Sequence, residues 1–245
     1  MFNKNGKIVR NVILLIIVVV ILLLLQGKRV KDEPKVPDDE IPSNVISLCF
    51  YKKDVSPNGP MGRYTLRMNL SGDKVDGELK FLPAEKDSKV GKFVGSVSAL
   101  DQMLMGRRIS AMWDTMAEGM NTTEELKIIF GEGTADVGFG EMTDRGDGVY
   151  VYKNPEAITY SLDMSDIGCE NLNEIENVEA YLKKNISTLS PVKAVLGGTW
   201  YVLYADINTS GDAGVVTYED GHIQEKKNFT YTLDASQNVV NLSLK

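Results

Sequence analysis

The sequence predicts a mainly β protein: an antiparallel meander, barrel- or sandwich-like, with one short α-helix and an N-terminal transmembrane helix. Three observations predict this class. Short segments rich in β-branched and aromatic residues recur along most of the chain, and nearly every joint between them holds Gly, Asp or Asn. One long apolar run stands near the start. Many short antiparallel strands cover their edges best in a barrel or a sandwich.

The apolar run, Val12 to Leu25, predicts a membrane anchor. Counted from Ile8, the stretch spans roughly 27 Å as a helix, which is enough for a thin bilayer. A cleaved signal peptide is the alternative, because basic residues precede the run. The residues that follow it lack the small-residue pattern of a cleavage site. We therefore expect a basic cytoplasmic tail at 1–11 and an anchor at 12–27.

The next segment, 28–43, is charged and contains three prolines, so it predicts a semi-extended stalk. Lys and Arg are equally frequent on the two sides of the anchor, so their distribution says little about which side of the membrane each end lies on. The only cysteines, Cys49 and Cys169, could close a disulfide, which persists only in an oxidising compartment. Two separate buried thiols are the alternative. We expect a single-pass protein of the cell membrane, with its N-terminus in the cytoplasm and its main domain outside.

Residues 44–170 predict a β-rich domain. The expected strands are 45–51, 64–70, 75–82, 93–100, 126–130, 135–139, 149–152 and 158–162. The segment 105–118 is ambiguous, because methionines recur at helical spacing while Ile109, Ala111 and Trp113 alternate as in a strand. The surrounding meander favours the strand.

Residues 171–190 predict a helix and connector. Asn173 and Glu176 have the spacing of a capping box, and an apolar stripe continues to about residue 186. Residues 191–245 then predict a C-terminal meander of four strands, at 199–207, 214–218, 222–233 and 239–244. The sequence leaves open whether this meander is a domain of its own.

The charge distribution bears on partners. Residues 1–31 hold six of the 27 basic residues and no acidic one, so the rest of the chain carries 21 basic against 34 acidic residues. This net charge of −13 disfavours nucleic acid or an anionic membrane surface as the partner of the body.

The inventory of reactive side chains is poor. The chain has one histidine, His222, directly after a predicted turn, whereas zinc sites and serine or cysteine triads normally need histidine. Glycine-rich phosphate or dinucleotide loops and a nucleophile elbow are absent from the sequence. No cofactor and no catalytic residue is therefore predicted.

One segment resembles the opening of a calcium loop: Asp206, Asn208, Ser210 and Asp212 occupy alternate positions. The twelfth position is Thr217, where such a loop has a bidentate Glu, and the flanks predict strands. The same residue types are what a tight turn selects, so a turn is favoured and calcium stays a weak alternative.

Two further groups have a functional and a structural interpretation. Glu118, Glu132 and Glu141 could supply an acid/base pair, but nothing in the sequence brings them together, and solvated surface acids are favoured. The methionines between residues 103 and 120 could line an adaptable pocket, but a packed core is favoured.

Several segments resemble a group of exported or membrane-anchored β-rich bacterial proteins without an assigned activity. The resemblance lies in residues 83–88 (PAEKDS), 118–120 (EGM), 139–142 (FGEM) and 218–223 (YEDGHI). It implies a bacterial envelope setting and transfers no functional residue.

Two functions follow as hypotheses. The anchor, the stalk and the poverty of catalytic residue types favour an extracytoplasmic binding or interaction module, whose partner is a small ligand or an envelope protein. The alternative is a histidine-independent hydrolase that acts on cell-envelope glycan through paired carboxylates.

Overall fold

The computed structural model describes residues 45–54, 62–84 and 87–245. The expected tail (1–11), anchor (12–27) and stalk (28–43) lie outside these residues. Within the described part of the chain, no helix has both the length and the apolar character needed to cross a bilayer. Residues 43–245 form one compact unit.

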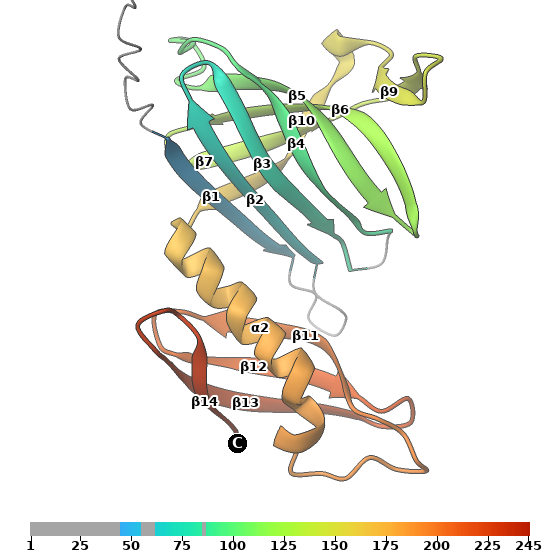
Figure 1. Cartoon of the computed structure of the whole chain (residues 1–245), viewed down its shortest axis with the longest axis vertical. Coiled ribbons are helices and arrows are strands. Elements are labelled where there is room, and N and C mark those ends of the chain that lie inside the picture. The colour runs from blue at the N-terminus through green and yellow to red at the C-terminus, as the bar shows by residue number, and fades with distance from the viewer. Residues whose placement is uncertain (1–44, 55–61, 85–86) are drawn as a thin grey trace, which may run out of the picture. The chain divides into compact units, whose positions relative to one another are not determined.

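Eight antiparallel strands form a closed barrel (Figure 1). Neighbouring strands in the sequence pair from β1 to β7, and β10 closes the barrel between β7 and β1. The barrel strands are β1 (Ile46–Asp54), β2 (Gly62–Ser71), β3 (Lys74–Leu82), β4 (Lys89–Val97), β5 (Arg107–Ala117), β6 (Met120–Gly131), β7 (Thr134–Phe139) and β10 (Thr159–Asp166). The prediction of a mainly β, barrel-like fold is confirmed.

Two barrel hairpins show why these turns form where they do. Glu118 and Gly119 connect β5 to β6, and Glu132 and Gly133 connect β6 to β7, all with positive φ. Two consecutive positive φ angles give the hairpin turn whose twist matches that of paired strands. Glycine adopts the second position without strain, which sets the register of both hairpins.

The barrel interior is a continuous apolar core. Alternate residues of each strand point inward, as Leu66, Met68 and Leu70 do on β2. Opposite them, Ile109 and Ile128 project from β5 and β6. This alternation fills most of an eight-stranded barrel, whose interior is only as wide as its side chains or one small ligand.

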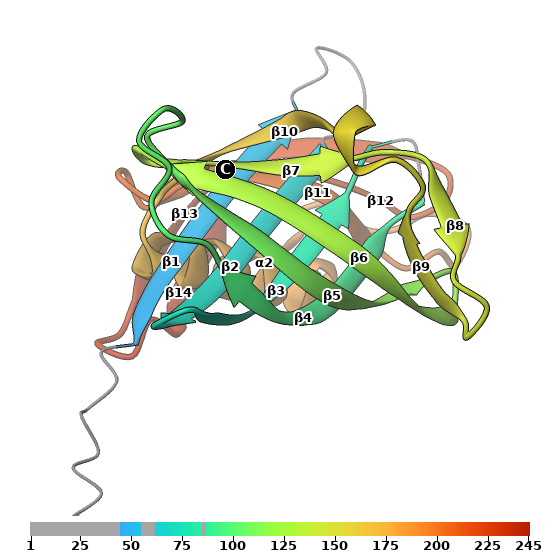
Figure 2. The ribbon, with the colours of Figure 1, turned by 90° about the horizontal axis from the view of Figure 1, so that it is seen from above.

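A small hairpin stands beside the barrel (Figure 2). It consists of β8 (Met142–Asp144) and β9 (Val149–Tyr152), and β9 pairs in parallel with the start of β6. A single 3-10 turn, η1 (Pro155–Ala157), then leads into β10. β8 was not predicted, because three residues show no alternation.

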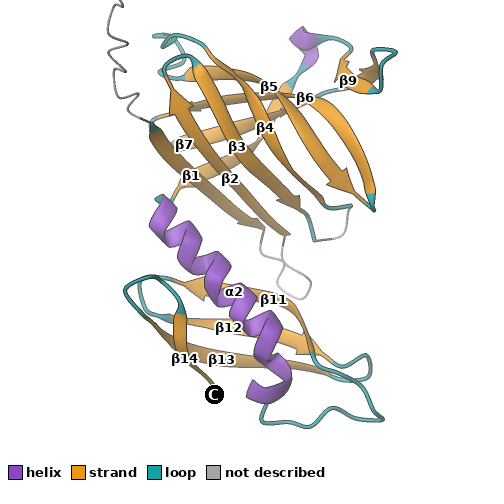
Figure 3. Ribbon diagram, in the orientation of Figure 1, coloured by secondary structure: helices purple, strands orange, loops and turns teal. Residues whose placement is uncertain are grey.

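One long helix, α2 (Cys169–Leu189), follows the barrel (Figure 3). Leu172, Val178, Leu182 and Ile186 form its buried stripe. The predicted capping box is wrong: the helix begins four residues before Asn173, and Gly168 is its N-cap. Glu176 instead contacts Arg67 and Lys80 of the barrel, because the tertiary partners outweigh the local capping pattern.

A second antiparallel sheet follows α2. Its strands lie in sequence order: β11 (Tyr201–Asn208), β12 (Ala213–Glu219), β13 (Gln224–Leu233) and β14 (Val239–Leu244). One face of this sheet packs against the helix residues Val178, Leu182 and Ile186. Trp200 and Tyr218 meet edge to face in this second core, with ring centroids 4.9 Å apart.

A disulfide joins the two parts. Cys49 of β1 and Cys169 of α2 are bonded, across a sequence separation of 120 residues. Cys49 is fully buried. The bond fixes the start of the helix against the barrel wall.

Two sequence predictions near β4 and β5 need correction. The expected strand 93–100 is shifted, since β4 spans Lys89–Val97 and residues 98–100 belong to the following loop. The ambiguous segment 105–118 contains the strand β5, as favoured. The expectation that the methionines between residues 103 and 120 form a packed core is wrong, because Met103, Met105, Met116 and Met120 are exposed. The inward phase of β5 belongs to Ile109, Ala111, Trp113 and Thr115.

Candidate ligand-binding site

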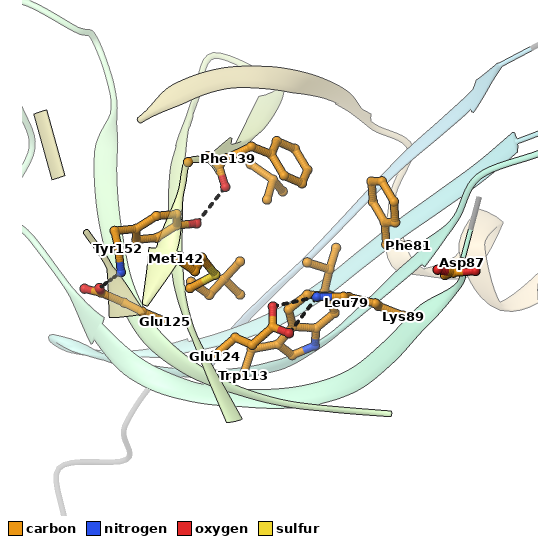
Figure 4. Close-up of a pocket in the computed structure, with 14 residues that line it drawn as sticks. Leu79, Phe81, Asp87, Lys89, Trp113, Glu124, Glu125, Phe139, Met142 and Tyr152 are labelled. Atoms are coloured by element: carbon orange, nitrogen blue, oxygen red, sulfur yellow. Dashed lines mark hydrogen bonds and ion pairs between the residues drawn. The ribbon is translucent and has the colours of Figure 1, made fainter. Parts of the chain in front are cut away.

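The barrel contains a cavity of about 350 Å³ at one rim (Figure 4). This is the rim where β3 ends, β4 begins and β5 turns into β6. The walls are mostly apolar and come from four barrel strands and the β8–β9 hairpin: Leu79, Phe81, Trp113, Leu126, Val137, Phe139, Met142 and Tyr152. The volume is within the range that holds a single small molecule.

Strand alternation brings two opposite charges into this rim. Lys89 of β4 is in phase with the buried Phe93, and Glu124 of β6 is in phase with the buried Leu126. The Lys89 ammonium donates to both oxygens of Glu124, at 2.6 and 2.8 Å. Thr122 donates a further hydrogen bond to Glu124 at 3.2 Å. The charges of Lys89 and Glu124 neutralise each other, and Asp87 adds a further carboxylate to the lining.

A donor without a partner lies in the cavity wall. The indole Nε1 of Trp113 is buried and makes no hydrogen bond among the described residues. The hydroxyl of Thr115, the next inward residue of β5, is buried without a partner as well. A buried polar group without a partner costs free energy, and such groups are rare enough in proteins to require an explanation.

The β8–β9 hairpin closes one side of the cavity. The Tyr152 hydroxyl donates to the Gly138 carbonyl at 2.8 Å, and the Tyr152 N–H donates to Glu125 at 3.1 Å. Burial and the nearby charge of Glu125 raise the pKa of Tyr152 to about 12, so its hydroxyl stays a donor at neutral pH. Both bonds hold the aromatic ring in the wall.

Glu125 itself points away from the barrel interior. Burial opposes its ionisation, but hydrogen bonds from Lys127 and from the Tyr152 N–H more than offset this and lower the pKa of Glu125. Its carboxylate is thus a structural acceptor that orders the hairpin.

The calcium candidates form a hairpin turn. Asp206 is paired with Lys53, and the side chain of Asn208 accepts the N–H of Ser210. Asp212 has a positive φ and ends the turn between β11 and β12. Among the described residues, no group of three or more His, Cys, Asp or Glu side chains is arranged to hold a metal ion. Local turn geometry accounts for Asn208, Ser210 and Asp212, and the ion pair with Lys53 accounts for Asp206.

The three carboxylates considered for acid/base chemistry do not meet. Glu118 and Glu132 are exposed turn residues at opposite rims of the barrel, and Glu141 is exposed in the connection before β8. None of them lines the cavity. His222 is exposed in the turn before β13.

The residues that shape the site were missed in the sequence. Lys89 and Glu124 stand in charged surroundings and look like solvated surface residues. The signal that could have found Glu124 is its phase, since it continues the apolar series of Leu126, Ile128 and Phe130 on β6. That phase has meaning only once the inner face of the barrel is known.

Comparison of the chain with family models, with curated proteins and with solved structures finds no match in any of the three.

Proposed function

We propose that this protein is a binding module, anchored in the membrane and exposed outside it, whose barrel holds one small, mainly apolar and uncharged molecule. The cavity at the barrel rim is the observation that carries this proposal. The anchor and its orientation come from the apolar run and the cysteine pair.

The lining supports an apolar ligand. Aromatic and aliphatic side chains from several strands converge on one space, with few polar groups, which is the composition typical of small-molecule sites. A ligand of this kind gains from leaving water in proportion to the apolar area that it buries.

The polar groups disfavour an anionic ligand. Lys89 is already paired with Glu124 and the Asp87 carboxylate also lines the cavity, so an added anion would find no free cation among the lining residues. The third N–H of Lys89 matches an acceptor such as a carbonyl, hydroxyl or ether oxygen.

Native mass spectrometry of residues 43–245 from an exporting host tests for a retained ligand, after unfolding and thiol assays confirm a folded, bridged protein. The same protein is then titrated with N-phenylnaphthylamine, an uncharged apolar fluorophore, and with its sulfonated analogue. We expect the uncharged probe to bind about tenfold more tightly or better, because the sulfonate would be desolvated without a counter-ion.

Two variants localise the binding. Met142→Trp adds bulk inside the cavity, whereas Met116→Trp makes the same change on the outer face of β5. Probe binding should be lost in the first variant and kept in the second. A folded parent protein that carries no ligand and binds neither probe, or equal binding in both variants, would remove the support for this function.

A further inference from the structure

The rim opposite the cavity carries an unusual loop. Residues 98–106 connect β4 to β5, and we call them the apolar loop. Four large apolar side chains point into solvent there: Leu100, Met103, Leu104 and Met105 are 62%, 96%, 43% and 56% exposed. Single exposed apolar residues are ordinary, but four within six positions mark a contact surface.

The apolar loop has a fixed shape. Asp101 and Gly106 exchange two backbone hydrogen bonds, of 2.8 and 3.3 Å, across its base. The Asp101 carboxylate also accepts the N–H groups of Met103 and Leu104. The backbone hydrogen bonds and the Asp101 carboxylate therefore define a tip that presents its apolar side chains outward.

The base of the loop is fastened to the barrel. Arg107 donates to the carbonyls of Ser98 and Gly72. A Cβ at Gly131 would lie 2.4 Å from the Met105 carbonyl oxygen, so only glycine permits this close approach of the loop to the end of β6. The exposure of the tip is thus a built feature of the barrel.

The chain itself indicates what covers this tip. β1 begins at the same rim (Figure 1), with Val45 and Ile46 exposed at its start. The sixteen residues of the expected stalk, 28–43, separate the expected anchor at 12–27 from residue 44. Sixteen residues reach at most about 55 Å, so an anchor in the apolar run lets this rim reach the bilayer.

We propose that the apolar loop inserts into the interface of the membrane that holds the anchor, with the ligand cavity at the opposite rim facing away from it. This inference rests on the anchor of the proposed function but not on ligand binding. Because the body carries a net negative charge, the contact with lipid is made by apolar side chains and not by electrostatic attraction. Arg107 and Arg108, next to the tip, then lie at the level of the lipid headgroups.

The test uses the full chain in nanodiscs of zwitterionic lipid, prepared with plain or brominated acyl chains. Met103→Trp places a reporter at the tip, and Tyr150→Trp places one on β9, beside the cavity. Val240→Trp, at an exposed apolar position of β14, controls for the affinity of tryptophan itself for the interface. The emission of the unsubstituted chain, from Trp113 and Trp200, is subtracted.

Brominated lipid should quench the added emission of Met103→Trp and leave that of Tyr150→Trp and Val240→Trp unchanged. Equal Met103→Trp emission in the two lipids overturns the inference, as does quenching of equal size at all three positions. If the Met103→Trp emission changes with protein concentration but not with bromine, the tip contacts a second copy of the chain. That result also overturns the inference.

The outcomes also separate this inference from the proposed function. If the chain fails to stay with the discs, the anchor fails and the inference fails with it. If the chain stays anchored and Met103→Trp is not quenched, only the inference is lost, since probe binding in the cavity is measured independently.

Discussion

At the scale of single residues, strand phase decides which side chains have a role. Glu124 and Glu125 are neighbours in the sequence, yet one faces the barrel interior and pairs with Lys89, and the other holds the β8–β9 hairpin from outside. The same rule places Trp113 in the cavity wall and the adjacent Met112 on the other side of β5.

Asp220 shows how a buried turn carboxylate couples stability to pH. It is 5% exposed, and it accepts the N–H groups of Val195, His222 and Ile223 at 2.7 to 2.9 Å. The hydrogen bond from Ile223 is the largest cause that lowers the pKa of Asp220, despite the opposing effect of burial. A carboxylate whose pKa is lower in the folded than in the unfolded state stabilises the folded protein at any pH above its unfolded-state pKa. This stabilisation is lost as the pH falls through its folded-state pKa.

We therefore expect the free energy of unfolding to fall as the pH drops below about 4, the ordinary pKa of aspartate. Asp220→Asn should be less stable than the parent at neutral pH and should lose less stability in acid. Urea unfolding at about pH 7, 5 and 3 measures this, with Asp76→Asn on the outer barrel face as control. Parallel pH profiles of the parent and Asp220→Asn would refute the role.

At the scale of elements, α2 is the part whose position depends most on distant residues. Its apolar stripe packs on the C-terminal sheet, while Cys169 and Glu176 tie its first half to the barrel. The stripe was readable in the sequence. The start of the helix was misplaced, because the disulfide and the ion pairs are formed with residues more than 90 positions away.

The disulfide can be tested at this scale. The double variant Cys49→Ala/Cys169→Ala should lose about 2–5 kcal/mol of stability, because the bond closes a long loop in the unfolded chain. Urea unfolding without reductant measures the loss. The parent protein with reductant serves as control and should match the variant. Identical midpoints for the parent and the double variant would show that the bond contributes nothing.

At the scale of the whole described unit, ion pairs between the barrel and α2 couple the two parts. Glu179, which is 7% exposed, accepts from Arg63 of β2 and from Lys183 one turn further along the helix. Burial lowers the pKa of Arg63, which shows that its charge is partly removed from water. Removal of one partner would leave the other charge poorly compensated.

Glu179→Ala should therefore destabilise the protein by about 2–3 kcal/mol, less than a fully buried pair because Arg63 keeps some contact with water. The double variant Arg63→Met/Glu179→Leu should regain most of that loss, since it replaces the pair by apolar contact. Asp163→Ala, which breaks an exposed pair with Lys52, is the control and should change stability by less than about 1 kcal/mol. A double variant no better than Glu179→Ala alone would contradict this account.

Most of the strands and the apolar stripe of the helix could be predicted from the sequence. They depend on local propensity and periodicity, which neighbouring residues set. The closure of a barrel by β10 against β1 and the meeting of Lys89 with Glu124 at a cavity depend on tertiary contacts that the sequence does not reveal. On β5, Met112 and Met116 of the outer face belong to a series at helical spacing, which competes with the strand alternation of Ile109, Ala111 and Trp113. Closure of the barrel selects the inner face, and it depends on contacts between residues far apart in the chain.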